Sequence, residues 1–181
     1  SSWHPHYYKT KVESLTVHSA LLYTPTASKI ILAAKESGLK GADDLLIDAI
    51  IHVLDKSIPD TTLFRLVPIP SSKASQRRRG RSFVVDLVSQ ISQRTGIPMI
   101  DCLQLSRRVL DQSGLHRDER ASNLAGAFTL ISPARGELIL IDDVVTTGAT
   151  LREAARALNS QGFQAIGSVT AITACVAQRL R

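Results

Sequence analysis

Blocks of apolar residues along the chain follow two spacings, and each spacing predicts one type of element. Residues 15–23 alternate loosely between apolar and polar side chains, which is typical of a strand. Apolar residues within 46–54 and within 83–91 recur every three or four positions, which predicts amphipathic helices. The full pattern predicts strands at 15–23, 63–67, 100–105, 128–131, 138–141 and 165–172, and helices at 29–36, 43–55, 83–94 and 151–158.

Local signals set some of the helix ends, and three stretches show no regular spacing. Asp43 or Asp44 is expected to cap the second helix, and Gly38 to end the first. Residues 1–12 are expected to be irregular, 71–81 to form a polar loop, and 106–123 to form a charged loop that runs into one helical turn. Elsewhere strands and helices alternate, and most strands are continuously apolar. That order predicts an α/β fold with a mainly parallel sheet of about five strands, covered by helices on both faces.

Composition narrows the class of protein. The chain has 181 residues, of which 44% are hydrophobic and 21% charged, as in a globular domain. No apolar stretch approaches the roughly 18 residues that a membrane-spanning helix needs. Residues 1–8 lack the pattern of a secretory signal, and Cys102 and Cys175 form neither a disulfide framework nor a metal-binding pair. We therefore expect a cytoplasmic protein with two reduced thiols.

The charge balance favours anionic partners. The formal net charge is +6, and the sequence pI is about 9.7. The densest positive cluster is Arg77-Arg78-Arg79 with Arg81, which suits pyrophosphate or nucleic-acid phosphate but also a solvated loop. No aromatic residues interleave this cluster, so recognition of single strands by base stacking has little support. Lys35 is most simply interpreted as an exposed helix residue, with a role in a site as the alternative.

The strongest chemical signal is the segment from Leu138 to Thr150, with the sequence LILIDDVVTTGAT. Four apolar residues predict a buried strand that ends on Asp142 and Asp143, and a helix is expected to begin at about Ala149 or Thr150. In an open α/β sheet, ligands bind at the carboxyl ends of the strands. The loop between this strand and this helix therefore lies where a binding site is expected.

The residues of this loop suit a sugar phosphate. Thr146, Thr147, Gly148, Ala149 and Thr150 offer hydroxyls and consecutive backbone N–H groups at a helix N-terminus, which binds a phosphate dianion. Gly148 permits close backbone approach or a positive φ. Asp142 and Asp143 would repel a phosphate, so they suit vicinal ribose hydroxyls or a hydrated Mg²⁺. The alternative is that Asp143 or Thr147 only caps the helix and Asp142 is a solvated strand end.

The segment resembles the phosphoribosylpyrophosphate (PRPP) motif of type I phosphoribosyltransferases, and the resemblance extends beyond that motif. It is similar in order and approximate spacing to the ComF (competence protein F) family at Arg78-Arg79-Gly80, Gln112, Gly114-Leu115, Arg120, Asn123 and Gly126-Ala127-Phe128. The match covers roughly residues 15–175 and is specific from 66 onward, with weaker similarity at Tyr23 and Lys35. The chain lacks the cysteine-rich zinc-binding start of many members, and Arg81-Ser82-Phe83 stands where the family commonly has Phe-Asn-Gln.

The resemblance implies a role for each matching segment. Asp142 and Asp143 would contact the ribose 2′ and 3′ hydroxyls, and would hold Mg²⁺ through water or those hydroxyls. Thr146 to Thr150 would hold the 5′-phosphate, with Val144 in the same substrate-binding segment. Ser71, Ser72 and Lys73 would form the pyrophosphate loop, with Arg79 as a further substrate-binding residue. Arg107 and Arg108 would belong to the loop that closes over the substrate, and would act in catalysis.

The resemblance also implies a domain organisation and two possible functions. The core would be residues 59–181, and residues 1–58 would form a small N-terminal hood or flanking subdomain. One function is an Mg²⁺-dependent phosphoribosyltransferase that transfers ribose 5-phosphate from PRPP to a nitrogen acceptor, with a nucleobase expected, and releases pyrophosphate. The other is a non-catalytic protein that binds PRPP or a nucleoside 5′-phosphate. It would act in DNA uptake by contacting single-stranded DNA or partner proteins through the basic loop.

Overall fold

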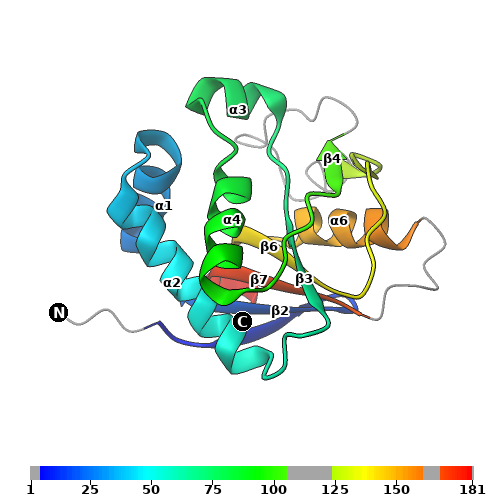
Figure 1. Cartoon of the computed structure of the whole chain (residues 1–181). Helices are drawn as coiled ribbons and strands as arrows, with labels where there is room; N and C mark the ends of the chain where they lie inside the picture. Colours follow the sequence, from blue (N-terminus) through cyan, green and yellow to red (C-terminus); the bar gives the residue numbers. More distant parts are fainter. Residues whose placement is uncertain (1–4, 106–123, 161–167, 181) are drawn as a thin grey trace.

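A five-stranded sheet forms the centre of the structure, a computed structural model that describes residues 5–105, 124–160 and 168–180 (Figure 1). The strands, in their order across the sheet, are β1 (Tyr8–Val12), β2 (Leu15–Leu22), β7 (Val169–Val176), β6 (Glu137–Val145) and β3 (Phe64–Pro68). β1 and β2 form an antiparallel hairpin, and the other neighbours pair in parallel. The predicted α/β fold with a mainly parallel sheet is confirmed.

Helices cover both faces of this sheet. On one face lie α1 (Pro25–Ser37), α2 (Lys40–Ser57) and α4 (Phe83–Thr95), and on the other lies α6 (Ala149–Asn159). A two-stranded antiparallel sheet of β4 (Leu103–Leu105) and β5 (Phe128–Leu130) packs beside α6. A short helix, α3 (Lys73–Arg79), follows β3, and a 3₁₀ turn (Gln178–Leu180) follows β7. None of the helices in the described ranges is long and apolar enough to cross a membrane.

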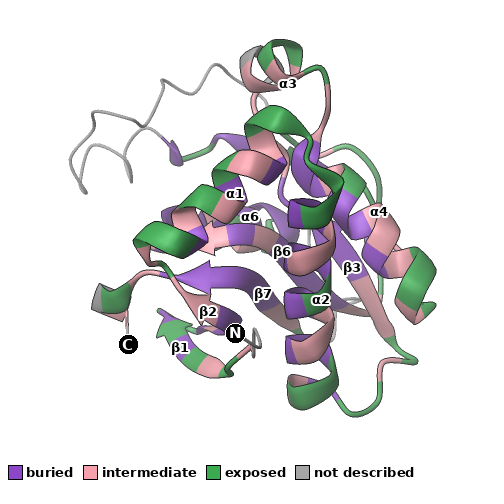
Figure 2. Ribbon diagram, turned by 90° about the vertical axis from the view of Figure 1, so that its left-hand side faces the viewer, coloured by how far each residue is buried: buried purple, intermediate pink, exposed green. Residues whose placement is uncertain are grey.

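The core has two layers, one on each side of the sheet. The first joins α1, α2 and α4 to strand residues such as Ile139 and Ile141, and the second joins α6 to residues such as Leu138 and Leu140. All four of these β6 side chains are fully buried, and Figure 2 shows the central strands as buried and the outer faces of the helices as exposed. Burial on both faces explains why this strand is continuously apolar in sequence.

Several predicted boundaries change for local reasons. α1 begins at Pro25, where Pro25-Thr26 offers a helix start in the sequence, and so extends four residues ahead of the periodic stretch 29–36. Thr24 caps it by accepting a hydrogen bond from the Ala27 N–H, and Pro25 suits the first helical position. The expected cap of α2 by Asp43 or Asp44 is wrong, since Leu39 occupies the cap position without a side-chain hydrogen bond. The buried Asp43 carboxylate instead accepts hydrogen bonds from Arg81.

The predicted polar loop at 71–81 is wrong in its centre, where α3 forms. Ser72 caps this helix by accepting a hydrogen bond from the Ser75 N–H at 3.1 Å, and Gly80, with φ 69°, ends it. The capping signals are present in the sequence, but a seven-residue polar helix has no apolar stripe to reveal it. The predicted short strand at 138–141 extends to Val145, and the last strand, Val169–Val176, runs beyond its predicted end at 172. Residues 106–123 and 161–167 lie outside the described residues.

The expectation of an irregular start is wrong from residue 8, where β1 begins. Its buried residues Thr10 and Val12 alternate with exposed lysines, as in an edge strand with one covered face. Both β1 and β2 belong to the sheet that carries the later strands, and α2 packs on β2, β7 and α4. Whether residues 1–58 form a separate hood stays a prediction.

Candidate functional site

The carboxyl ends of β3 and β6 lie side by side, which brings two of the predicted binding segments to one edge of the sheet. The strands pair in parallel, and the Ile69 N–H donates to the Ile141 carbonyl at 3.0 Å. Ser71 and Ser72 follow β3, and the loop 146–148 follows β6. The strand was predicted to end on Asp142 and Asp143. It runs on to Val145, so both carboxylates and Val144 lie within the last residues of β6 that pair with β7.

The two adjacent carboxylates have different surroundings. Asp143 is 6% exposed, and its backbone N–H donates to Asp142 Oδ1 at 2.9 Å. Asp142, by contrast, is half-buried. Burial, and next the charge of Asp143, raise the pKa of Asp142 above its usual value. The pair therefore holds a proton more readily than two solvated aspartates would.

A lysine from α1 completes this acidic pair. Lys35 Nζ lies 2.5 Å from Asp143 Oδ2, and the lysine side chain is 24% exposed. The same ammonium group lies 5.8 Å from the centre of the Phe83 ring at the start of α4. Lys35 is therefore not simply an exposed helix residue, and its role as a site residue stays a prediction. The weak similarity around Lys35 was the one sequence signal for it, since 108 positions separate it from Asp143.

The loop after β6 has the geometry of an anion-binding turn. Gly148 has φ 78° and precedes α6, whose first two residues are Ala149 and Thr150. Thr147 Oγ1 accepts a hydrogen bond from the Ala149 N–H at 3.3 Å. The N–H groups of Thr150 and Leu151 have no acceptor among the described residues, as expected in a first helical turn. Hydroxyls and open amides thus gather at one helix start, next to the acidic pair.

Some residues of the segment predicted to bind pyrophosphate already make hydrogen bonds within α3. Ser72 caps α3, and the Ser71 carbonyl accepts a hydrogen bond from Gln76. Lys73 is the first residue of α3 and Arg79 the last. Arg79 Nε donates to Glu36 Oε1 of α1 at 2.9 Å, so this arginine ties α3 to α1.

The other arginines of the basic cluster differ in whether they have a carboxylate partner. Arg81 binds both oxygens of the buried Asp43 at 2.9 and 3.0 Å and lies 5.0 Å from the centre of the Phe83 ring. Arg77 and Arg78 are exposed and make no ion pair with any described residue. The basic cluster therefore offers two free guanidinium groups, whereas Arg79 and Arg81 hold helices together. The predicted catalytic residues Arg107 and Arg108 lie outside the described residues.

The donor set limits what metal the site can take. Within the described ranges, no group of three or more His, Cys, Asp or Glu side chains converges as a metal site. Two adjacent carboxylates, one of them paired with Lys35, fit a Mg²⁺ ion that keeps most of its water or substrate ligands. They do not fit an ion held by protein groups alone.

Neither cysteine suits nucleophilic chemistry. Cys175 is fully buried on β7, and burial raises the pKa of its thiol to about 12, with a further contribution from the charge of Asp143. Burial likewise raises the pKa of the Cys102 thiol to about 11. The thiolate is the reactive form, so both groups are inert side chains of the core.

Comparisons with known proteins agree with this geometry. A family model described as the phosphoribosyl transferase domain matches residues 77–179, which include β6, the loop after it and α6. A curated protein named Competence protein F, from Haemophilus influenzae (strain ATCC 51907 / DSM 11121 / KW20 / Rd), is 32% identical over 107 residues. That alignment covers 56% of this chain and 46% of the relative, so it spans less than half of the relative's length.

A solved structure gives a more distant similarity. It is a hypoxanthine phosphoribosyltransferase from Staphylococcus aureus with 14% sequence identity and a TM-score of 0.41. The match covers 77% of this chain and 65% of that chain.

Proposed function

The chain belongs to the phosphoribosyl transferase domain family, and on that premise we propose that it binds PRPP and transfers its ribose 5-phosphate to a nitrogen acceptor, with a nucleobase as the expected acceptor class. One observation carries the proposal. An acidic pair, of which Asp143 is buried and Asp142 half-buried, stands directly next to an open helix N-terminus at the carboxyl end of β6. These two features match the two ends of a ribose 5-phosphate, which has vicinal hydroxyls at one end and a dianion at the other.

The loop 146–148 and the start of α6 would bind the 5′-phosphate. The open N–H groups of Thr150 and Leu151 donate to phosphate oxygens, and the hydroxyls of Thr146, Thr147 and Thr150 add further donors. The positive end of the helix dipole stabilises the dianion, typically by about 0.3–1 kcal/mol at an exposed site. Thr150 is half-buried and Ala149 buried, so the phosphate would sit at the opening of the turn rather than inside the core.

The acidic pair would bind the ribose hydroxyls. Ionised carboxylates accept hydrogen bonds only, so vicinal hydroxyls are matched donors. Lys35 pairs with Asp143, and the positive charge of the lysine offsets part of the repulsion between the acidic pair and the phosphate. Val144, between the acidic pair and the loop, packs into the core and fixes the position of the strand end.

Mg²⁺ is expected to accompany the substrate, because the family is typically Mg²⁺-dependent and the donor set fits a largely hydrated ion. Asp142 and Asp143 would hold it through water or through the ribose hydroxyls. When bound, the ion would neutralise charge on the pyrophosphate. The contribution of this chain is to position the sugar, and its buried carboxylates and helix amides are preorganised for that purpose.

Transfer would break the bond between the anomeric carbon and the pyrophosphate oxygen and form a bond to the acceptor nitrogen. The pyrophosphate takes the bonding electrons, and the acceptor nitrogen loses its proton. Ser71, Ser72 and Lys73 would receive the pyrophosphate beside β6, and Arg107 and Arg108 would offset its developing charge. The pairing of β3 with β6 supports this arrangement, because it sets the two segments at one edge.

Calorimetric titration of PRPP, with and without Mg²⁺, tests the proposal. Binding that Mg²⁺ strengthens, followed by pyrophosphate release with one base from a panel of nucleobases, is the expected result. The Asp142→Asn/Asp143→Asn double variant should lose PRPP binding while keeping the far-ultraviolet circular dichroism of the wild type. Asp55→Asn, which changes an exposed aspartate of α2, is the matched control and should bind as the wild type does. Unchanged PRPP affinity in the double variant would reject this site.

A second candidate function is favoured by the exposed arginines of α3. Arg77 and Arg78 have no ion-pair partner among the described residues, and the net charge of the chain is +6. The same PRPP or nucleotide site would then serve a binding protein, with DNA phosphates or a partner protein on this surface. The curated relative named Competence protein F is consistent with this alternative.

Salt-dependent DNA binding distinguishes the two candidates. If α3 contacts DNA, Arg77→Ala/Arg78→Ala should weaken binding to a single-stranded oligonucleotide and lower the slope of affinity against salt by about 2. Lys56→Ala/Arg135→Ala removes two exposed charges elsewhere and serves as the control for net charge. Equal losses in the two double variants would show that only net charge attracts DNA.

A further inference from the structure

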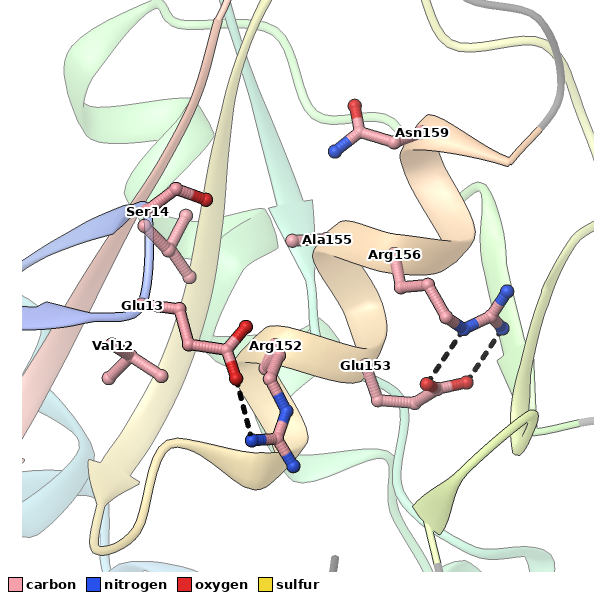
Figure 3. A pocket seen from close by; sticks show the side chains of 9 residues that line it. Val12, Glu13, Ser14, Arg152, Glu153, Ala155, Arg156 and Asn159 are labelled. Carbon is pink, nitrogen blue, oxygen red and sulfur yellow. Dashed lines mark hydrogen bonds and ion pairs between the residues drawn. The ribbon is translucent and has the colours of Figure 1, made fainter.

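The turn of the β1–β2 hairpin meets the beginning of α6, the helix that follows the candidate phosphate loop. Figure 3 shows Val12, Glu13 and Ser14 of this turn facing the side chains of α6. The hairpin comes from the start of the chain, and α6 lies more than 130 residues later. Nothing in the family resemblance or in the proposed site assigns a role to this contact.

Val12 fills the space beside Gly148. A Cβ atom at residue 148 would lie 2.5 Å from Val12 Cγ2, and closer still to Val12 Cγ1. Separations under about 3 Å are not compatible with real side chains, so the valine and the loop are in direct packing contact. Val12 is itself 8% exposed and belongs to the core layer that includes Leu151 of α6. The glycine is therefore required by the hairpin as well as by its own φ of 78°.

Glu13 makes the second contact from an unusual backbone conformation. It is the one non-glycine residue with a positive φ in the described ranges, at 56°. Such a conformation is unfavourable for a residue with a Cβ atom. Its carboxylate accepts a hydrogen bond from Arg152 Nη1 at 3.0 Å, and Arg152 lies in the first helical turns of α6. The Arg152 backbone N–H donates to the Gly148 carbonyl, so the ion pair holds a residue that is itself hydrogen-bonded to the last residue of the loop.

A hollow of about 340 Å³ lies between the hairpin turn and α6. On the α6 side it is lined by residues from Arg152 to Asn159, so it includes the ion-paired Arg152 (Figure 3). The second half of α6 is held differently. Arg156 pairs with Glu153 at 2.7 Å and donates to the Phe128 carbonyl of β5. The helix also packs on β4, β5 and β6, and Val12 and Glu13 add the contacts that the hairpin makes next to the loop.

We propose that the hairpin turn, through Val12 and Glu13, holds the loop 146–148 and the first turn of α6 in the shape that receives a phosphate group. Glu13 and Arg152 are then positioning residues that need not touch the ligand. The phosphate part of this inference rests on the proposed function, whereas the restraint of the loop does not. Both partners of the ion pair are exposed, so its contribution is modest. We expect its loss to weaken the binding of a phosphate ligand by about two- to fivefold.

The direction in which one substitution changes the affinity for an anion distinguishes positioning from simple electrostatic attraction. Glu13→Arg adds positive charge near the loop, so attraction at a distance would tighten the binding of an anion. Positioning requires the opposite, since the variant breaks the ion pair and sets two arginines against each other. We expect Glu13→Arg to bind ribose 5-phosphate about threefold more weakly than the wild type in calorimetric titration. Arg152→Glu should also weaken binding, and the Glu13→Arg/Arg152→Glu double variant should recover the wild-type affinity within about twofold.

Amide hydrogen exchange of the ligand-free chain tests the restraint without any ligand. Exchange at residues 147–151 should quicken in Glu13→Arg and return to the wild-type rate in the charge-swapped double variant. Glu13→Gln provides a milder version, and circular dichroism checks that each variant folds. Arg94→Glu is the matched control, because it breaks an exposed ion pair with Asp44 and Asp48 that joins α4 to α2. It should leave both the exchange of 147–151 and the affinity unchanged.

The outcomes distinguish the two proposals. If the wild type binds no ribose 5-phosphate but exchange follows the expected pattern, the proposed function fails and the restraint by the hairpin stands. If exchange at 147–151 is the same in all variants, or if Glu13→Arg binds ribose 5-phosphate more tightly, the inference about the hairpin is overturned whatever the function.

Discussion

Lys35 and Asp143 form an ion pair between α1 and the carboxyl end of β6, with 2.5 Å between Nζ and Oδ2. The carboxylate side chain is 8% exposed and the lysine side chain 24%, so the pair is largely shielded from solvent. The next residue on α1, Glu36, pairs with Arg79 of α3. One helical turn of α1 therefore contacts both the acidic pair and the helix that carries the basic cluster.

Removing the lysine should destabilise the protein. Lys35→Met leaves the buried Asp143 carboxylate without its partner, and we expect the free energy of unfolding to fall by about 1–3 kcal/mol at pH 7. Urea unfolding followed by circular dichroism measures the change. Lys29→Met removes an exposed lysine from the same helix and should alter stability by less than about 0.5 kcal/mol. Equal stability of the two variants would show that the ion pair contributes nothing.

The acidic pair makes stability depend on pH through Asp142. Its pKa is raised by burial and then by the charge of Asp143, so the folded chain binds this proton more tightly than the unfolded chain. The resulting stability is fully present below the unfolded pKa, about 4, and is lost as the pH rises through the folded pKa. Asp142→Asn stays neutral and still offers an oxygen to the Asp143 N–H. We expect its urea stability to match the wild type near pH 4 and to exceed it increasingly toward pH 8.

Asp143→Asn should show the opposite effect and serves as the comparison for Asp142→Asn. It leaves Lys35 without a carboxylate, so we expect lower stability than the wild type at pH 8. If both variants were more stable than the wild type at pH 8, or both less stable, the distinct environments described for the two carboxylates would be contradicted.

Gly148 should tolerate no side chain. Gly148→Ala combines an unfavourable positive φ with a clash against Val12, and we expect a loss of about 2–4 kcal/mol in thermal or urea unfolding. Gly96 is the matched control, because its φ is 76° and a Cβ there would meet nothing within 4 Å. Gly96→Ala should lose only about 1–2 kcal/mol. Losses of equal size would mean that the contact with Val12 has no energetic weight.

The two thiols should resist alkylation in the folded protein. With the pKa of Cys102 at about 11 and that of Cys175 at about 12, at most about one thiol in a thousand is thiolate at pH 8. Mass spectrometry after iodoacetamide treatment should find neither residue modified in native conditions and both modified in guanidinium chloride. Rapid native labelling of either residue would show that its site opens readily.

Some features of the site could be predicted from nearby residues alone. The apolar run 138–141, the acidic pair and the hydroxyl-rich loop are contiguous, so local chemistry and strand–helix order predict a ligand site after β6. The strand was expected to end on Asp142 and Asp143, but the pairing of Asp142 with Thr173 and of Val144 with Cys175 extends it to Val145. A register shared with a distant strand has no local signal. The helix α3 was missed because its caps are local but its exposed polar face has no periodicity.

The sequence by itself determined the α/β class, the mainly parallel sheet and the position of the loop, because apolar periodicity, turn residues and a contiguous motif act over a few neighbouring residues. Only the tertiary structure decided that Lys35 pairs with Asp143. It also decided that Arg79 binds Glu36 and Arg81 binds Asp43, while Arg77 and Arg78 stay exposed. The contact of Val12 and Glu13 with the start of α6 is a third such result. Each of these contacts joins segments tens of residues apart in the chain. Such contacts arise when packing brings the elements together, and the identity of either residue alone carries no information about its partner.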